Sequence, residues 1–231
     1  MLGGTMLGAI RHKGFIPWDD DMDFGIPRKY YEKALSLLRE NLPSHYHVVT
    51  AWDSPEVFYE TAKIEDSRTI LDDMRSSSRL QDKIGINIDI FPLDCTGCKT
   101  HSIYWLLHLQ TIIFVQSSSP SPLKNIIKHT ARRLAPFEKT FLLNYIRKRI
   151  AHIPPGEYLT NFMGRHKQKE VVPETWFGEP QRYPFEDYEF CGVVLYDKYL
   201  TQLYGDYMQL PPAGERSPHT ESAYTRCDGS I

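Results

Sequence analysis

The sequence has 231 residues, of which 41% are hydrophobic and 24% are charged, as in an ordinary globular domain. Its 27 basic and 29 acidic residues give a formal net charge of −2, so no global positive field attracts nucleic acid or an anionic membrane. Four cysteines are too few for a disulfide framework, and the longest apolar stretch, residues 103–115, is shorter than the ~20 residues that a membrane span needs. We therefore expect one α+β domain over residues 1–231, located in the cytoplasm, with no nucleic-acid partner.

The first half of the chain alternates between helix and strand signals. A short strand is expected to end at Gly4-Thr5, and a polar loop at residues 11–14 leads into an acidic run. Pro27 opens a helix that stops at Asn41, because its apolar residues follow the i, i+3, i+4, i+7 stripe of a half-buried helix. Strands are predicted at residues 46–50, 57–64 and 85–91, the last from its period-two alternation.

The second half begins with a helical pattern from residue 101 to residue 151, with breaks near residues 117–122 and at Pro136. We expect a helical subdomain there. Within it, residues 124–149 carry basic side chains and aromatic residues at helical spacing, which fits a solvated helix face and also fits peripheral contact with the inner face of a membrane. Short strands are expected within residues 185–195, a helix from near Asp197 to Tyr204, and a loop from Pro211 onward.

The acidic run Asp19-Asp20-Asp21-Met22-Asp23 places four carboxylates within five residues. Like charges packed this closely cost stability unless a cation compensates them. If Asp21 and Asp23 lie on one strand, their side chains share a face, which suits a hard divalent cation such as Mg²⁺ or Mn²⁺. A solvated acidic turn is the alternative, but Trp18 and Phe24 flank the run and favour a metal site.

A third carboxylate is expected at Asp89, the lone acid on the predicted strand at residues 86–91. An unpaired charge buried on a strand is costly, so Asp89 requires a partner, and the sequence leaves two open: the metal and an arginine. Upstream of the acidic run, Gly4, Thr5 and Gly8 offer backbone amides and a hydroxyl for a close approach to phosphate.

A small-residue loop, a D-x-D strand and one more Asp on a separate strand form the pattern of the nucleotidyltransferase superfamily. More specifically, residues 4–23, GTMLGAIRHKGFIPWDDDMD, resemble the signature of the LicD family almost residue for residue. That family includes bacterial phosphorylcholine transferases and is related to the fukutin group. Residues 88–94 resemble its second motif, and residues 196–200, 204–208 and 211–212 resemble its C-terminal block, so the resemblance runs over nearly the whole chain.

The resemblance implies a nucleotidyltransferase-like mixed β-sheet flanked by helices. It also implies transfer of a phospho-alcohol such as phosphocholine from a CDP-linked donor to a glycan or glycolipid acceptor: lipopolysaccharide, teichoic acid or capsule. On this basis Asp21 and Asp23 hold Mg²⁺, and Asp89 is the third carboxylate, as metal ligand or general base. The cations expected to meet the donor phosphates are Arg11, His12, Lys13 and Lys63. A true nucleotidyltransferase acting on a small acceptor, and a truncated non-catalytic remnant, are the alternatives.

The remnant alternative follows from the start of the sequence. Members of the family carry a helix and the start of a strand before the Gly-Thr motif, whereas here the motif begins at residue 4. With only Met1 to Gly3 ahead of it, little strand is expected to form. The 231-residue form is therefore expected to express poorly or to be weakly active.

Two further patterns are less specific. Cys95, Cys98 and His101 have ligand-like spacing for zinc, but no matching pair follows, so free thiols are the expected state. Aromatic faces recognise a choline headgroup. Trp52, Tyr59, Trp176 and Tyr183 are candidates for such a cage, with core packing as the alternative.

Overall fold

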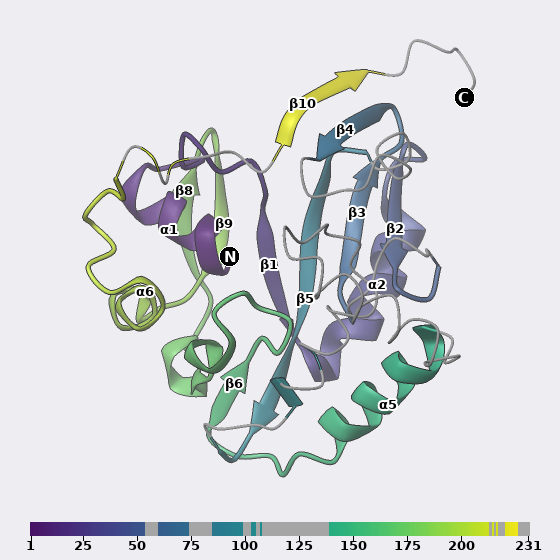
Figure 1. The fold of residues 1–231 in the computed structure, drawn as a ribbon, viewed down its shortest axis with the longest axis vertical. Helices are drawn as coiled ribbons and strands as arrows, with labels where there is room; N and C mark the ends of the chain where they lie inside the picture. Colours follow the sequence, from purple (N-terminus) through teal and green to yellow (C-terminus); the bar gives the residue numbers. More distant parts are fainter. Residues whose placement is uncertain are drawn as a thin grey trace, which may run out of the picture.

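The computed structural model describes residues 1–53, 60–73, 85–98, 103–104, 107, 139–212, 214, 216 and 220–225. Its centre is a six-stranded sheet in the order β2-β3-β5-β6-β7, with β1 paired to β5 off this path (Figure 1). The β1–β5 pair is parallel, and the other pairs of this sheet are antiparallel. The strands are β1 (Asp23–Pro27), β2 (Tyr46–Thr50), β3 (Ala62–Asp66), β5 (Asn87–Thr96), β6 (Tyr158–Thr160) and β7 (Val172–Pro173). This is the mixed α+β fold that the sequence predicts.

Helix α2 (Arg28–Asn41) covers one face of the sheet and confirms the helix predicted from the apolar stripe. Its residues Tyr31 and Leu35 are buried against Ala62 of β3 and Ile90 of β5. The Tyr31 hydroxyl donates a hydrogen bond to the carbonyl of Ile90, 3.0 Å away, so the one polar atom on this stripe is paired. Because side chains alternate along a strand, the residues next to these apolar ones point to the opposite face.

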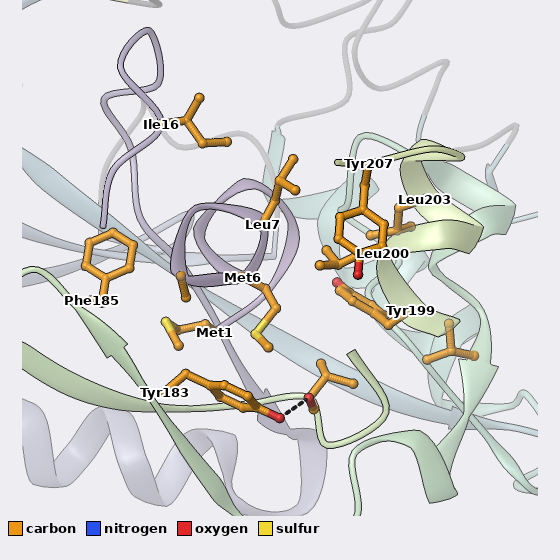
Figure 2. Packing of buried hydrophobic residues seen from close by; sticks show 13 residues of the cluster. Met1, Met6, Leu7, Ile16, Tyr183, Phe185, Tyr199, Leu200, Leu203 and Tyr207 are labelled. Carbon is orange, nitrogen blue, oxygen red and sulfur yellow. Dashed lines mark hydrogen bonds between the residues drawn. The ribbon is translucent and has the colours of Figure 1, made fainter. Parts of the chain in front are cut away.

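A second layer lies beside β1 and contains α1 (Gly3–Arg11), α6 (Tyr196–Tyr204) and the hairpin of β8 (Gln181–Phe185) and β9 (Tyr188–Gly192) (Figure 1). Its core gathers residues from both ends of the chain, and Figure 2 shows Met6 of α1 between Tyr183 and the residues of α6. Helix α6 confirms the predicted helix near Asp197. Two 3₁₀ turns, η1 (Lys167–Glu170) and η2 (Glu174–Trp176), join this layer to the sheet.

The strand predicted to end at Gly4-Thr5 is wrong, because these residues form the first turn of α1. Glycine is a poor helix former, so the local sequence favours a loop here. The helix forms because it buries Met6 and Ala9 completely, both 0% exposed. A Cβ on Gly8 would lie 2.4 Å from the carbonyl oxygen of Gly14, so Gly8 serves the close packing of the following loop.

The helical subdomain predicted at residues 101–151 is described in part. Helix α5 (Lys139–Ala151) ends before Pro154, as predicted, and buries Leu143, Ile146 and Ile150. Ile103, Tyr104 and Leu107 pack in the same cluster as Ile146. The rest of residues 99–138 lies outside the described residues. Within the described ranges, no helix combines the length and apolar character needed to cross a bilayer.

The loop predicted from Pro211 onward is wrong at β10 (Thr220–Thr225), which pairs antiparallel with β4 (Thr69–Asp73). The two strands lie far apart in the sequence, and the residues of neither strand indicate which strand it pairs with. Strands of this kind depend on a long-range partner for their backbone hydrogen bonds, which a local pattern does not reveal.

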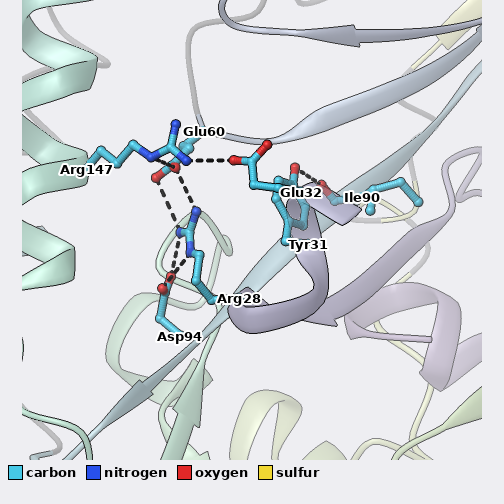
Figure 3. Close-up of polar contacts among 7 residues, drawn as sticks. All are labelled: Arg28, Tyr31, Glu32, Glu60, Ile90, Asp94 and Arg147. Carbon is cyan, nitrogen blue, oxygen red and sulfur yellow. Dashed lines mark hydrogen bonds and ion pairs between the residues drawn. The ribbon is translucent and has the colours of Figure 1, made fainter. Parts of the chain in front are cut away.

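An ion-pair network built around two buried carboxylates joins α2, β5 and α5 (Figure 3). Arg28 holds Asp94 through two hydrogen bonds, of 2.8 and 2.9 Å, and donates to Glu60 at 2.7 Å. Arg147 of α5 contacts Glu60 at 3.3 Å and Glu32 of α2 at 2.6 Å. The side chains of Glu60 and Asp94 are each only 7% exposed. The network therefore ties helix α5 to the sheet that carries the candidate site.

Candidate active site

Three charged side chains form a row across β3, β5 and β1. Lys63 is the cross-strand partner of Asp89, and Asp89 is the cross-strand partner of Asp23. Partners in register point to the same face, here the face opposite α2. The Lys63 ammonium donates to Asp89 Oδ1 at 2.5 Å and to Asn87 Oδ1 at 2.8 Å. The prediction that Asp89 lies on a strand is confirmed, and this strand pairs with β1 so that Asp89 lies beside Asp23. The sequence left a metal and an arginine open as its partner, and in the structure a lysine pairs with it.

The N-terminus of α1 packs against the acidic run. Leu2 donates its amide hydrogen to the carbonyl of Asp23 at 2.9 Å, and the Asp23 amide donates to the Thr5 hydroxyl at 2.7 Å. A Cβ on Gly3 would lie 3.4 Å from Asp23 Oδ2, and one on Gly4 would lie 2.4 Å from Asp19 Oδ2. The Gly-Gly-Thr segment therefore positions the carboxylates themselves. Only glycine fits at Gly4 without moving Asp19.

Asp21 precedes β1, which begins at Asp23, so the two residues do not share one strand. The sheet instead aligns Asp23 with Asp89, while Asp21 reaches the cluster from the preceding segment. Its charge raises the pKa of both Asp19 and Asp23, which places it among them. A carboxylate cluster is thus present, built differently from the predicted same-strand pair.

Burial and mutual repulsion shift the protonation of this cluster. Burial, followed by the charges of Asp21, Asp89, Asp19 and Glu170, raises the pKa of Asp23 to about 8. Burial, followed by Asp21, raises the pKa of Asp19 to about 7. Both shifts favour the protonated carboxyl groups near neutral pH, and a bound cation would displace those protons, because metal ligands must be ionised.

These oxygen donors fit a hard divalent cation by charge and by chemistry. Mg²⁺ and Mn²⁺ prefer carboxylate ligands, and a cation would relieve the repulsion that raises the pKa of Asp23. In the described part of the chain, no three His, Cys, Asp or Glu side chains are already grouped closely enough to hold a metal ion. The donor set fits such an ion by charge and chemistry, and the side chains would have to move to close around it.

Sequence reasoning missed a second wall of the site, built from η1 and α6. Glu170 is buried, and burial raises its pKa to about 7. The Tyr199 hydroxyl accepts a hydrogen bond of 3.1 Å from the Gly3 amide, and the Tyr204 hydroxyl lies 3.8 Å from the Cβ position of Gly3. Tyr199 and Tyr204 belong to the segments that resemble the LicD C-terminal block. No pattern in the sequence pointed to Glu170.

Three predicted phosphate-binding residues, Arg11, His12 and Lys13, lie at the other end of α1. The helix has nine residues, so about 12 Å separates Arg11 from Gly3 at 1.5 Å per residue. Arg11 donates to the Tyr207 carbonyl at 2.7 Å and to His12 Nε2 at 2.9 Å. The structure therefore does not bring them to the Asp23–Asp89 pair, whereas it does bring Lys63 there.

The two less specific patterns add nothing to this site. Cys95 and Cys98 are exposed free thiols, as expected, and His101 lies outside the described residues. Tyr183 is buried and donates to the Val193 carbonyl at 3.0 Å, so it packs in the core (Figure 2). Trp176 packs against the same core, Trp52 is exposed, and Tyr59 lies outside the described residues.

A mixed sheet with carboxylates on two adjacent parallel strands, facing the glycine-rich start of a helix, defines a nucleotidyltransferase-like domain. Family comparison agrees: residues 1–137 match the LicD/FKTN/FKRP nucleotidyltransferase domain. The chain is also 32% identical over 228 residues to the lipopolysaccharide cholinephosphotransferase LicD of Haemophilus influenzae, covering 94% of this chain and 84% of that protein. The chain therefore belongs to the LicD family.

Two uncharacterised rickettsial proteins match over a much shorter stretch. Proteins of Rickettsia prowazekii and Rickettsia typhi are each 70% identical over 23 residues, which is 10% of this chain and 9% and 7% of theirs. These short matches support no statement about the activity of the whole chain.

Proposed function

We propose that this chain is a metal-dependent phosphotransferase that moves a phospho-alcohol from a CDP-linked donor to a cell-surface glycan. Phosphocholine and lipopolysaccharide are the first candidates, because the H. influenzae relative carries the name of a lipopolysaccharide cholinephosphotransferase. The observation that carries the proposal is the Asp23–Asp89 cross-strand pair in a chain of this family. Asp21 and Asp23 would hold Mg²⁺ or Mn²⁺, with Asp89 as the third carboxylate.

The proposed reaction is an in-line displacement at phosphorus. A glycan hydroxyl oxygen forms a bond to the phosphorus that carries the alcohol, and the bridging P–O bond of the diphosphate breaks. The electron pair of that bond leaves with CMP, and the hydroxyl proton passes to a base. When bound, the metal neutralises charge on the diphosphate. Lys63 donates to Asp89 and Asn87 in this structure, and it would be the cation that meets a donor phosphate if Asp89 served as a metal ligand.

The reaction is tested by incubating the protein with Mg²⁺, purified lipopolysaccharide or teichoic acid, and a panel of CDP-choline, CDP-ethanolamine and CDP-glycerol. We expect CMP release that depends on one acceptor, with the phospho-alcohol recovered on the glycan by ³¹P NMR. Pyrophosphate release from CTP with a small acceptor would instead indicate a nucleotidyltransferase. A folded protein that yields neither product under all these conditions would contradict any transferase activity.

Peripheral membrane contact is proposed on one observation from α5. Phe141 and Tyr145 are 56% and 44% exposed on the face that also carries Lys148, opposite the buried Leu143 and Ile146. Exposed aromatic and basic residues on one helix face suit an anionic bilayer surface. Sedimentation with anionic vesicles should fall on changing both Phe141 and Tyr145 to Ser, and unchanged sedimentation would reject the contact.

A further inference from the structure

The segment of residues 161–170 reaches the acidic site from a part of the chain that the proposed reaction has not yet used. The position that a Cβ would take on Gly3 lies 3.4 Å from Asp23 Oδ2 and 3.8 Å from the Tyr204 hydroxyl. The Tyr204 ring in turn packs edge-to-face against the ring of His166, with centroids 4.7 Å apart and planes at 80°. Asp23, Tyr204 and His166 therefore follow one another along one wall of the site. Arg165 directly precedes His166 in the sequence.

The backbone around Arg165 is held from within its own turn. The Gly164 amide donates to the Asn161 carbonyl at 3.1 Å, and the His166 amide donates to Glu170 Oε1 at 3.3 Å. A Cβ on Gly164 would lie 2.5 Å from the same Glu170 oxygen, so the turn closes tightly around this buried carboxyl group. The turn thus fixes the main chain of Arg165 while its side chain stays exposed to solvent.

The positive charge of Arg165 acts on groups on both sides of the site. Burial raises the pKa of Asp19, and the charge of Arg165 opposes that rise. Burial likewise raises the pKa of Tyr204, and Arg165 again acts in the opposite direction. Asp19 approaches Gly4 and Tyr204 approaches Gly3, so both groups on which the charge of Arg165 acts lie at the start of α1.

A diphosphate needs cations at this place, because it must approach a cluster that is already negative. Two cations that the sequence assigned to the donor phosphates already have partners in this structure: Lys63 donates to Asp89 and Asn87, and Arg11 donates to Tyr207 at the far end of α1. A guanidinium matches phosphate oxygens with two parallel hydrogen bonds, which an ammonium cannot do. We propose that Arg165, presented beside the Tyr204–His166 pair, binds the diphosphate of the nucleotide-linked donor. This inference rests on the proposed function.

The test is calorimetric titration of CDP-choline into the 231-residue chain with Mg²⁺ and without acceptor, so that binding is measured apart from turnover. Arg165→Gln should weaken donor binding by about 10- to 100-fold, the range expected for losing charge-assisted hydrogen bonds. Arg165→Lys should restore only part of the loss. The matched control is Arg182→Gln, an exposed arginine on β8, which should bind as wild type does.

Thermal melting of each variant is followed in parallel, and an unchanged melting temperature shows that the turn is intact. If the wild type binds CDP-choline and Arg165→Gln binds it equally well, Arg165 is not a donor ligand and the proposed function stands. If the wild type binds none of the CDP-alcohols, the proposed function fails and the role of Arg165 fails with it.

Discussion

Asp23→Asn is expected to lower turnover by at least roughly a hundredfold while leaving the metal-free protein at least as stable as wild type. A metal ion supplies several kcal/mol of charge stabilisation in the transition state, and each ~1.4 kcal/mol is a factor of ten in rate. Without metal, burial and the neighbouring carboxylates disfavour an ionised Asp23, so replacing it by a neutral amide should cost no stability. Turnover of CDP-choline and thermal melting in EDTA measure the two effects.

The same residue sets a pH dependence whose sign follows from its raised pKa. The pKa of Asp23 is about 8 in the folded chain, against an ordinary value of 3.8. Between these values the folded state binds more protons than the unfolded state, so stability falls as pH rises from about 4 to about 8. Asp23→Asn should flatten this decline in EDTA, and Mg²⁺ should bind more weakly to the wild type as pH falls below 8.

Asp187→Asn is the control, because Asp187 is an exposed carboxylate on the β8–β9 turn away from the cluster. It should change neither turnover nor the pH profile of melting. A clearly lower melting temperature for Asp23→Asn in EDTA would show that the carboxylate is structural. The metal site would then have to be abandoned.

Arg28→Met should destabilise the protein by about 3–5 kcal/mol, the usual cost of leaving buried charges without their partner. Asp94 and Glu60 both depend on Arg28, and their side chains are 7% exposed. Burial alone would lower the pKa of Arg28, but Asp94 and Glu60 raise it above its ordinary value, so the guanidinium stays charged. Urea denaturation measures the loss as a lower midpoint with an unchanged slope.

A matched control uses an exposed ion pair of the same chemistry. Arg39 and Asp53 lie 3.0 Å apart with side chains 45% and 52% exposed, and such pairs contribute up to about 1 kcal/mol. Arg39→Met should therefore cost much less than Arg28→Met. Equal losses for the two variants would mean that the Arg28 network in Figure 3 contributes no more than a surface contact.

The sequence predicted best those elements whose signal is local. Helix α2 has an apolar stripe with a proline at its start, and α6 ends at a glycine. Strand β2 is a short run of residues with high β-strand propensity. Each of the three elements appears where it was expected. The Asp23–Asp89 pairing was also predicted, from one carboxylate on an otherwise apolar strand and from the family resemblance.

The helix at the start of the chain was not predicted, because its stability is tertiary. Three glycines in α1 favour a loop, and only the burial of Met6 and Ala9 against α6 and the β8–β9 hairpin explains the helix. The second wall of the site, formed by Glu170, Tyr199 and Tyr204, was missed for a different reason. These residues lie more than a hundred positions from the acidic run, and no spacing rule links them to it.

The location of a bound Mn²⁺ ion tests the central claim most directly, because Mn²⁺ substitutes for Mg²⁺ and scatters anomalously. Crystals grown with Mn²⁺ and CDP-choline at about pH 8 should show an anomalous peak between the carboxylates of Asp23 and Asp89, with Asp21 among its ligands. The peak should vanish in Asp23→Asn crystals grown in the same way. Protein that turns over its donor yet shows Mn²⁺ only away from Asp23 and Asp89 would contradict a metal-dependent site at this pair.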